Sequence, residues 1–287
     1  MSMSRKLWAS VGFAVVATLP AAGIAATAAD DNTPALHRHD HGAAADGRIQ
    51  VAVGESGEGG EAGEAGEAGD AFQGGDEQIA LRGRLMLVRG HVRVGTELVA
   101  QNRLDEAMPH FHHPIEEIYP ELKGPLTKAG VTGFKASLEN GSRAVMAKAP
   151  KAKIDAAVAG IDKAVAGAVA RIPARTRAAP SFIYGVIAGV METAAGEYGE
   201  AVKDGKFVAV VEYQDGRGFI LEARDYFEKN KAILAAKDAE ATQRLADLFA
   251  QLTPVWPQAM PPATPVMSPG EVQALASRVE LLKRRFD

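Results

Sequence analysis

Apolar residues recur every three or four positions along most of the chain after residue 77, the spacing that places them on one face of an α-helix. The clearest stripes lie in residues 77–101, 104–122, 154–172 and 272–286. A shorter one includes Phe134 and Leu138, and another helix is expected from Ser181 to about Lys203. The pattern predicts an all-α fold, a helical bundle of about six to seven helices.

Prolines and caps refine this prediction. Four prolines interrupt the stripe that begins at Leu104, so kinks or short helical pieces are expected there. Ser268, Pro269 and Glu271 form a capping box with proline at the first helical position, which marks the start of the last helix. Residues 253–269 contain six prolines and predict an extended, Pro-rich strap across the bundle.

Residues 206–222 fit two structures. Two apolar runs flank Asp215-Gly216, which is typical of a short β-hairpin. As a helix, the same stretch would place Glu212, Asp215 and Phe219 on one side. We favour the helix, because an isolated hairpin is marginally stable.

The first 28 residues resemble a secretory signal peptide. Arg5 and Lys6 precede an apolar run from Leu7 to Leu19, and small residues follow. The alternative is an uncleaved anchor, but this run is shorter than the roughly 20 residues that cross a bilayer. We therefore expect a cleaved signal, a periplasmic or secreted protein, and no membrane span after cleavage.

Residues 29–76 have the composition of a disordered linker rich in His, Gly and Glu. Residues 29–77 carry 12 acidic and 2 basic side chains, and residues 57–70 repeat Gly, Glu and Ala. Like charges with little apolar surface favour an unfolded chain. The predicted organisation is a signal peptide at 1–28, this linker at 29–76 and a helical domain at 77–287.

Composition excludes several kinds of chemistry. The chain has no cysteine, so disulfides, thiolate metal sites and cysteine nucleophiles are absent. The body lacks a cluster of Lys and Arg interleaved with aromatics, so nucleic acid is not an expected partner. No serine-hydrolase motif, His-Glu-x-x-His, P-loop or dinucleotide motif occurs, and we expect a protein that is not an enzyme.

Histidine and glutamate are concentrated in the stretch after Leu104. On a continuous helix, Glu106, His110, His113 and Glu117 follow one another at steps of four, three and four. Side chains so spaced are neighbours and can share one metal ion. A second pair at four residues, His112 and Glu116, lies beside them. The alternative is a solvated outer face of an amphipathic helix.

His91 belongs to the first predicted helix and is surrounded by apolar positions. A core histidine bonded to a backbone carbonyl is one explanation. If the first two helices pack antiparallel, however, His91 lies 11 residues before the turn and His112 lies 10 after it. The two residues would then lie at the same position along the helix axes to within about one turn, which would bring His91 toward the second-helix cluster.

The linker histidines and the acidic residues of the later helices are weaker candidates for metal ligands. His37, His39 and His41 in the linker could capture a divalent metal and pass it on, or could be incidental. The carboxylates of the later helices are expected at the surface: Glu192, Glu197, Glu200, Glu212, Asp215 and Glu222. A ferritin-like site would need Glu-x-x-His on two helices, and no histidine follows His113.

Residues 90–98 and 110–119 resemble uncharacterised exported all-helical proteins of Gram-negative bacteria. The chain is also faintly similar to imelysin-type periplasmic proteins, helical bundles linked to iron handling that carry a Gly-x-His-x-x-Glu motif. His113 and Glu116 match the His-x-x-Glu part, and Phe111 stands where the motif has glycine. This resemblance implies a metal-related role.

These observations lead to one leading hypothesis, a periplasmic helical protein that binds or handles a divalent transition metal (Zn, Cu or Fe). His110, His113 and Glu117 are the first expected ligands, and His91, His112 and Glu116 the next. The competing hypothesis is a non-catalytic scaffold without metal, in which the proline-rich segments dock a periplasmic protein partner.

Overall fold

The computed structural model describes residues 71–287, and within them it confirms the all-α helical bundle. The predicted signal peptide, the linker as far as residue 70, and His37, His39 and His41 lie outside the described residues. The helices are α1 (Glu77–Ala100), α2 (Leu104–His113), α3 (Tyr119–Lys128), α4 (Phe134–Met146), α5 (Lys151–Val169), α6 (Ala174–Arg177), α7 (Pro180–Ala201), α8 (Val210–Lys237), α9 (Ala239–Leu252) and α10 (Pro269–Glu280).

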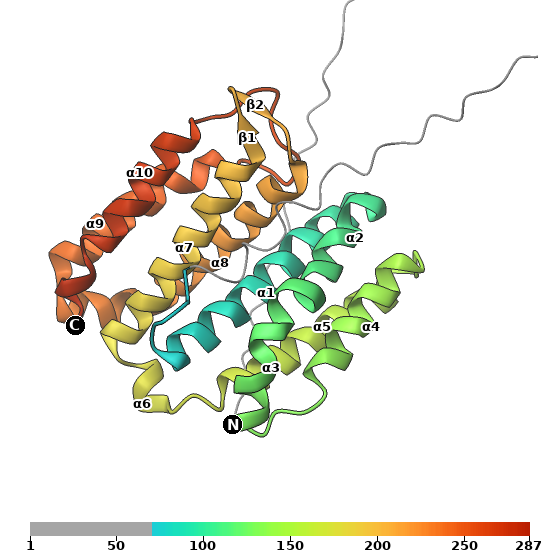
Figure 1. Ribbon diagram of the computed structural model, residues 1–287, viewed down its shortest axis with the longest axis horizontal. Helices are drawn as coiled ribbons and strands as arrows, with labels where there is room; N and C mark the ends of the chain where they lie inside the picture. The colour runs from blue at the N-terminus through green and yellow to red at the C-terminus, as the bar shows by residue number, and fades with distance from the viewer. Residues whose placement is uncertain (1–70) are drawn as a thin grey trace, which may run out of the picture. The chain divides into compact units, whose positions relative to one another are not determined.

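Helix α1 runs through the middle of this bundle (Figure 1). It packs against α7 and α8 on one side and against α2 and α5 on the other. Helices α9 and α10 add an outer layer through α8 and α7, while α4 pairs with α5 and α2. Because α1 is surrounded, most of its side chains are buried, including His91.

Helix α2 continues into α3 through a π-helical turn, η1 (Pro114–Ile118). Pro114 has no N–H to donate and its ring would crowd the carbonyl of His110 in a regular α-helix. The backbone widens instead, so that the N–H of Tyr119 bonds the carbonyl of Pro114, five residues earlier. The expected proline distortion is therefore a π turn, a feature that often occurs at functional sites.

The hairpin considered for residues 206–222 does not form. Two-residue strands β1 (Val202–Lys203) and β2 (Lys206–Phe207) pair across a turn at Asp204 and Gly205, both with positive φ. Helix α8 starts at Val210 and continues through Asp215-Gly216. The favoured helical alternative is thus confirmed for most of this segment.

The proline-rich segment crosses the ends of α7 and α8, as a strap would. A 3₁₀ turn, η2 (Thr253–Val255), is followed by irregular chain as far as the capping box at Ser268. The hydroxyl of Tyr198 donates to the carbonyl of Met267, and that of Tyr213 to the carbonyl of Gln258. Trp256, which belongs to the strap, has a fully buried side chain. A short 3₁₀ turn, η3 (Lys283–Arg285), follows α10.

Glycines allow two close packing contacts. Phe72 lies within the stretch predicted as linker, yet it is buried against Gly83 and Gly189, where an added Cβ would meet its ring at 2.2 and 2.3 Å. Helices α1 and α8 cross at Gly90 and Gly218. A Cβ on Gly218 would lie 2.2 Å from the carbonyl oxygen of Gly90, so the two backbones are in direct contact there.

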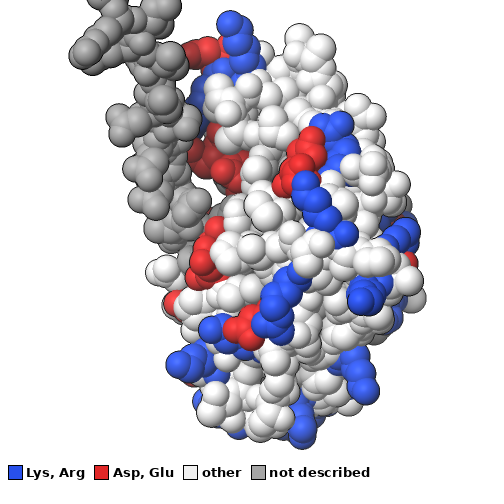
Figure 2. Space-filling view, turned by 90° about the vertical axis from the view of Figure 1, so that its right-hand side faces the viewer, with Lys and Arg blue, Asp and Glu red and all other residues white. Residues whose placement is uncertain are grey.

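Within residues 71–287 no helix combines the length and apolarity that a membrane span requires. On the face shown in Figure 2, basic and acidic side chains are interspersed with neutral ones. Such mixing gives no single-sign field over that face of the kind that steers a polyanion.

Replacing Gly218 with alanine should lower the free energy of unfolding by about 3 kcal/mol or more. Overpacking normally costs about 1–3 kcal/mol, and here the obstacle is backbone that cannot rotate away. Guanidinium unfolding followed by circular dichroism measures the change.

Gly160→Ala in α5 is the matched control, because nothing lies within 4 Å of its added Cβ. It should raise the free energy of unfolding by about 0.5–1 kcal/mol, the usual gain from alanine inside a helix. Equal effects of the two substitutions would contradict a backbone contact at Gly218.

Candidate metal centre

Three buried side chains from three helices meet in the interior of the bundle. Nδ1 of His91 in α1 lies 2.7 Å from Oδ1 of Asp215 in α8, and Nδ1 of His110 in α2 lies 2.7 Å from the same oxygen. All three side chains are fully inaccessible to solvent. Their ligand atoms lie within 4.8 Å of one another, close enough to surround one metal ion.

The turn between α1 and α2 brings the two histidines together. Asn102 has φ of 59°, and the N–H of Arg103 bonds the carbonyl of Leu98, which ends α1 in a left-handed cap. The chain then folds back, and the rings of His91 and His110 lie 6.4 Å apart between centroids. The expected approach of His91 to the second-helix cluster is confirmed.

Neighbouring residues orient these rings. Phe219 packs edge-on against His91, with 5.0 Å between ring centroids. Oε1 of Gln214 lies 2.9 Å from Nε2 of His110, and the amide nitrogen of Gln214 contacts Sδ of Met260 in the strap. If Nε2–H of His110 donates to Gln214, Nδ1 of His110 faces Asp215 and is free to bind a metal. Metal-binding histidines are usually held in this way, with the other ring nitrogen donating a hydrogen bond.

Burial alone would raise the pKa of Asp215, but the imidazoles of His91 and His110 hold it well below its ordinary value. Asp215 is therefore an anion inside the protein. A buried carboxylate of this kind needs positive charge beside it, which either protonated imidazole or a bound cation can supply.

His113 and Glu117 extend the cluster on the α2 side. Nδ1 of His113 lies 3.5 Å from Oδ2 of Asp215 and 3.7 Å from Oε1 of Glu117. Burial alone would lower the pKa of His113, but the nearby carboxylates of Asp215 and Glu117 raise it to about 9. Both residues were expected to be ligands, and the structure places both beside the buried group.

Two further carboxylates face this interior, contrary to the expected surface placement of the later acidic residues. Glu197 in α7 is only 5% exposed, and burial, followed by the charges of Asp215 and Glu212, raises its pKa well above the ordinary value. Burial and the charge of Asp215 likewise raise the pKa of half-buried Glu212. The surface prediction was wrong for Asp215 and Glu197, whereas Glu192 and Glu200 are exposed.

Other predicted residues lie outside this cluster. His112 and Glu116 form a pair with 3.0 Å between Nε2 and Oε1, and their side chains are 45% and 63% exposed. Glu106 pairs with Arg103 at the surface. The residues of the His-x-x-Glu match, His113 and Glu116, therefore point to different sides of the helix.

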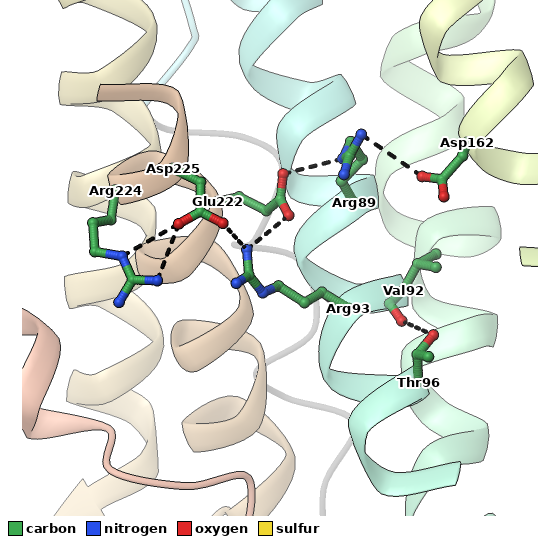
Figure 3. Close-up of polar contacts among 8 residues, drawn as sticks. All are labelled: Arg89, Val92, Arg93, Thr96, Asp162, Glu222, Arg224 and Asp225. Atoms are coloured by element: carbon green, nitrogen blue, oxygen red, sulfur yellow. Dashed lines mark hydrogen bonds and ion pairs between the residues drawn. The ribbon is translucent and has the colours of Figure 1, made fainter. Parts of the chain in front are cut away.

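Ion pairs on the other side of α1 join it to α8 (Figure 3). Nη1 of Arg93 lies 3.1 Å from Oε1 of Glu222 and 2.7 Å from Oδ2 of Asp225. Arg89 contacts the second oxygen of Glu222 and reaches Asp162 in α5. The two arginines flank His91 along the helix, and their ion pairs are partly exposed and lie outside the buried group.

Comparison with known proteins finds a similar domain family. A family model described as the iron permease-associated 4-helix bundle domain matches residues 173–284, which is less than half of the chain. No curated protein and no solved structure gives a significant match. The matched range spans α6 to α10 and includes Glu197, Glu212 and Asp215, whereas the histidines come from α1 and α2.

The donor set suits a divalent transition metal. Two imidazole nitrogens and a carboxylate oxygen form the group that typically holds non-haem iron, and imidazole also suits zinc and copper. Among the described residues, Oε2 of Glu117, Oε2 of Glu212 and Oδ2 of Asp215 are buried without a hydrogen bond. Buried oxygens are normally bonded, so an ion here would satisfy atoms that the protein itself does not.

The metal-free protein should lose stability as pH rises from about 6.5 through about 9. The raised pKa of His113 means that its contribution is complete below its ordinary value of 6.5 and disappears as the proton leaves near pH 9. Melting temperatures measured in chelator between pH 6 and 9.5 test this, and His113→Gln should flatten the curve.

His112→Gln is the control for the same experiment, because its exposed ion pair with Glu116 lies outside the cluster. This variant should keep the wild-type pH dependence. The assignment to His113 fails if both variants follow the wild-type curve.

Proposed function

We propose that this protein binds iron, as a divalent ion, inside its helical body. The first ligands are His91, His110 and Asp215. The observation that carries the proposal is the approach of Nδ1 of both histidines to 2.7 Å from one oxygen of Asp215, inside a fully buried group. Histidines from separate helices that converge on a single carboxylate oxygen form a preorganised coordination site.

Two observations favour iron over the zinc and copper that the sequence leaves open. The ligand group consists of two histidines and one carboxylate, and further carboxylates surround it. The domain family similar to residues 173–284 is described as associated with an iron permease. The chain also has no thiolate, which would be the usual ligand of Cu(I).

We further propose that the protein works outside the cytoplasm as a metal-handling protein and not as an enzyme. The signal-like first 28 residues support export, and the permease association of the similar family supports a role in iron supply. In this scheme the body would hold the ion near a membrane iron permease. The histidines of the linker, His37, His39 and His41, would collect it.

Asp215→Asn should weaken binding of Fe²⁺ by at least about 100-fold. Loss of a positioning residue beside a metal ligand typically costs 10–100-fold, so loss of the only anionic ligand in the group should cost more. The titration uses the full chain with His37, His39 and His41 replaced by alanine, under anaerobic conditions. Trp256 reports on the site, because a Cβ on the adjacent Gly216 would lie 3.0 Å from its indole nitrogen.

Asp225→Asn is the matched control on the same helix, since Asp225 pairs with Arg93 at the surface. It should leave the affinity for Fe²⁺ unchanged. Equal affinities of the wild type and Asp215→Asn would refute the site. If neither protein binds Fe²⁺ or Zn²⁺ more tightly than roughly micromolar, the metal-free scaffold is the better explanation.

Affinity alone does not identify iron, because such sites generally bind Zn²⁺ more tightly than Fe²⁺. The metal content of untagged protein, purified from cells supplied with both metals, decides between them. Iron should predominate in the wild type and be absent from Asp215→Asn. Zinc alone would leave the site intact but contradict the proposed metal.

A further inference from the structure

The interior contains more ligand groups than one metal ion uses. Beyond His91, His110 and Asp215, it holds His113 from α2, Glu117 from η1, Glu197 from α7 and Glu212 from α8. The two oxygens of Asp215 face different partners. Oδ1 lies 2.7 Å from Nδ1 of both His91 and His110, whereas Oδ2 lies 3.5 Å from Nδ1 of His113.

Three carboxylate oxygens of the described cluster have no hydrogen-bond partner. Within residues 71–287, Oδ2 of Asp215 and Oε2 of both Glu117 and Glu212 are buried without a hydrogen bond. Asp215 is completely inaccessible, so water at the surface cannot solvate its second oxygen. A cation bound beside Oδ2 of Asp215, with the other two carboxylates turned toward it, would satisfy all three oxygens.

The number of carboxylates in the cluster also favours a second ion. Four carboxylates occupy the cluster, from Glu117, Glu197, Glu212 and Asp215. One divalent ion balances two of them, and the other two then need protons or another cation beside them. Two divalent ions balance all four.

We propose that the cluster holds a second divalent transition metal ion, bound by His113, Glu117 and Glu212. Asp215 bridges the two ions, with Oδ1 on the first and Oδ2 on the second. Glu197 is the fourth carboxylate of the cluster and is not assigned as a ligand of either ion. The inference rests on the proposed function, because the bridge requires an ion at His91 and His110.

The two positions differ in how well they are formed. Among the described residues, His91, His110 and Asp215 are the only group of three or more whose ligand atoms all lie within 4.8 Å of one another. The second position is more open, since Oε1 of Glu117 is 3.7 Å from Nδ1 of His113 and the carboxylates must move inward. Binding should therefore occur in two steps, with the second ion at least about 10-fold weaker because ligand reorganisation opposes it.

Metal stoichiometry tests this inference. The full chain, with its three linker histidines replaced by alanine, is titrated with Zn²⁺ and dialysed against a fixed free concentration for metal analysis. The wild type should bind two equivalents, and Glu117→Gln together with Glu212→Gln should bind one. Glu116→Gln is the control, since its side chain is 63% exposed beside Glu117, and it should still bind two.

Mn²⁺ provides an independent measurement that does not need a variant to fold. Ions that share a carboxylate lie about 3.5–4 Å apart, and two Mn²⁺ at that separation give an exchange-coupled electron paramagnetic resonance spectrum. The wild type at two equivalents should show this spectrum, and Glu117→Gln alone should show uncoupled Mn²⁺.

The outcomes separate this inference from the proposed function. One equivalent in the wild type, lost in Asp215→Asn, overturns the second ion and leaves the first site in place. Two equivalents without exchange coupling place the second ion elsewhere and also overturn the bridge. No binding at all removes both proposals.

Discussion

The contact between the backbones of α1 and α8 at Gly90 and Gly218 determines how the rest of the interior is arranged. His91 follows Gly90, and Asp215 precedes Gly218 by three residues, so the crossing brings an imidazole and a short carboxylate within 2.7 Å. Gly95 has the same role toward α2, since a Cβ there would lie 3.2 Å from that of His110. Helices held at the usual 8–10 Å by larger residues would keep these side chains apart.

The carboxylates on the two sides of α1 differ in burial and in their partners. On the outer side, Arg89 and Arg93 meet carboxylates of α8 at partly exposed positions, where each pair contributes little to stability. On the inner side, Asp215 and Glu197 are buried, and carboxylates there destabilise the fold unless a proton or a cation accompanies them. An ion that binds only the folded protein would therefore stabilise it through the same groups.

Much of the helical framework could be predicted from spacing and caps, since α1, α7 and α10 begin within a residue or two of their expected positions. The approach of His91 to α2 followed from equal distances to the turn. Asp215 and Glu197 could not be placed in this way, because α8 lacks a clean apolar stripe and acidic residues usually lie at the surface. The signal that could have revealed Asp215 is the pair Gly216 and Gly218, which suggested a turn but serves close helix packing.

The carboxylates and the imidazoles of the cluster come from two different parts of the chain, and this affects which metal ions the cluster would prefer. The range similar to the iron permease-associated domain contributes only carboxylates and Gln214 to the cluster, whereas every imidazole comes from α1 and α2. Carboxylates alone would favour hard ions such as Mg²⁺ or Ca²⁺. In the proposed sites, the imidazoles of His91, His110 and His113 would shift the preference toward transition metals, and the surrounding carboxylates would keep the set harder than a typical copper site. That preference would therefore depend on the two histidine-bearing helices, α1 and α2, packed against α8.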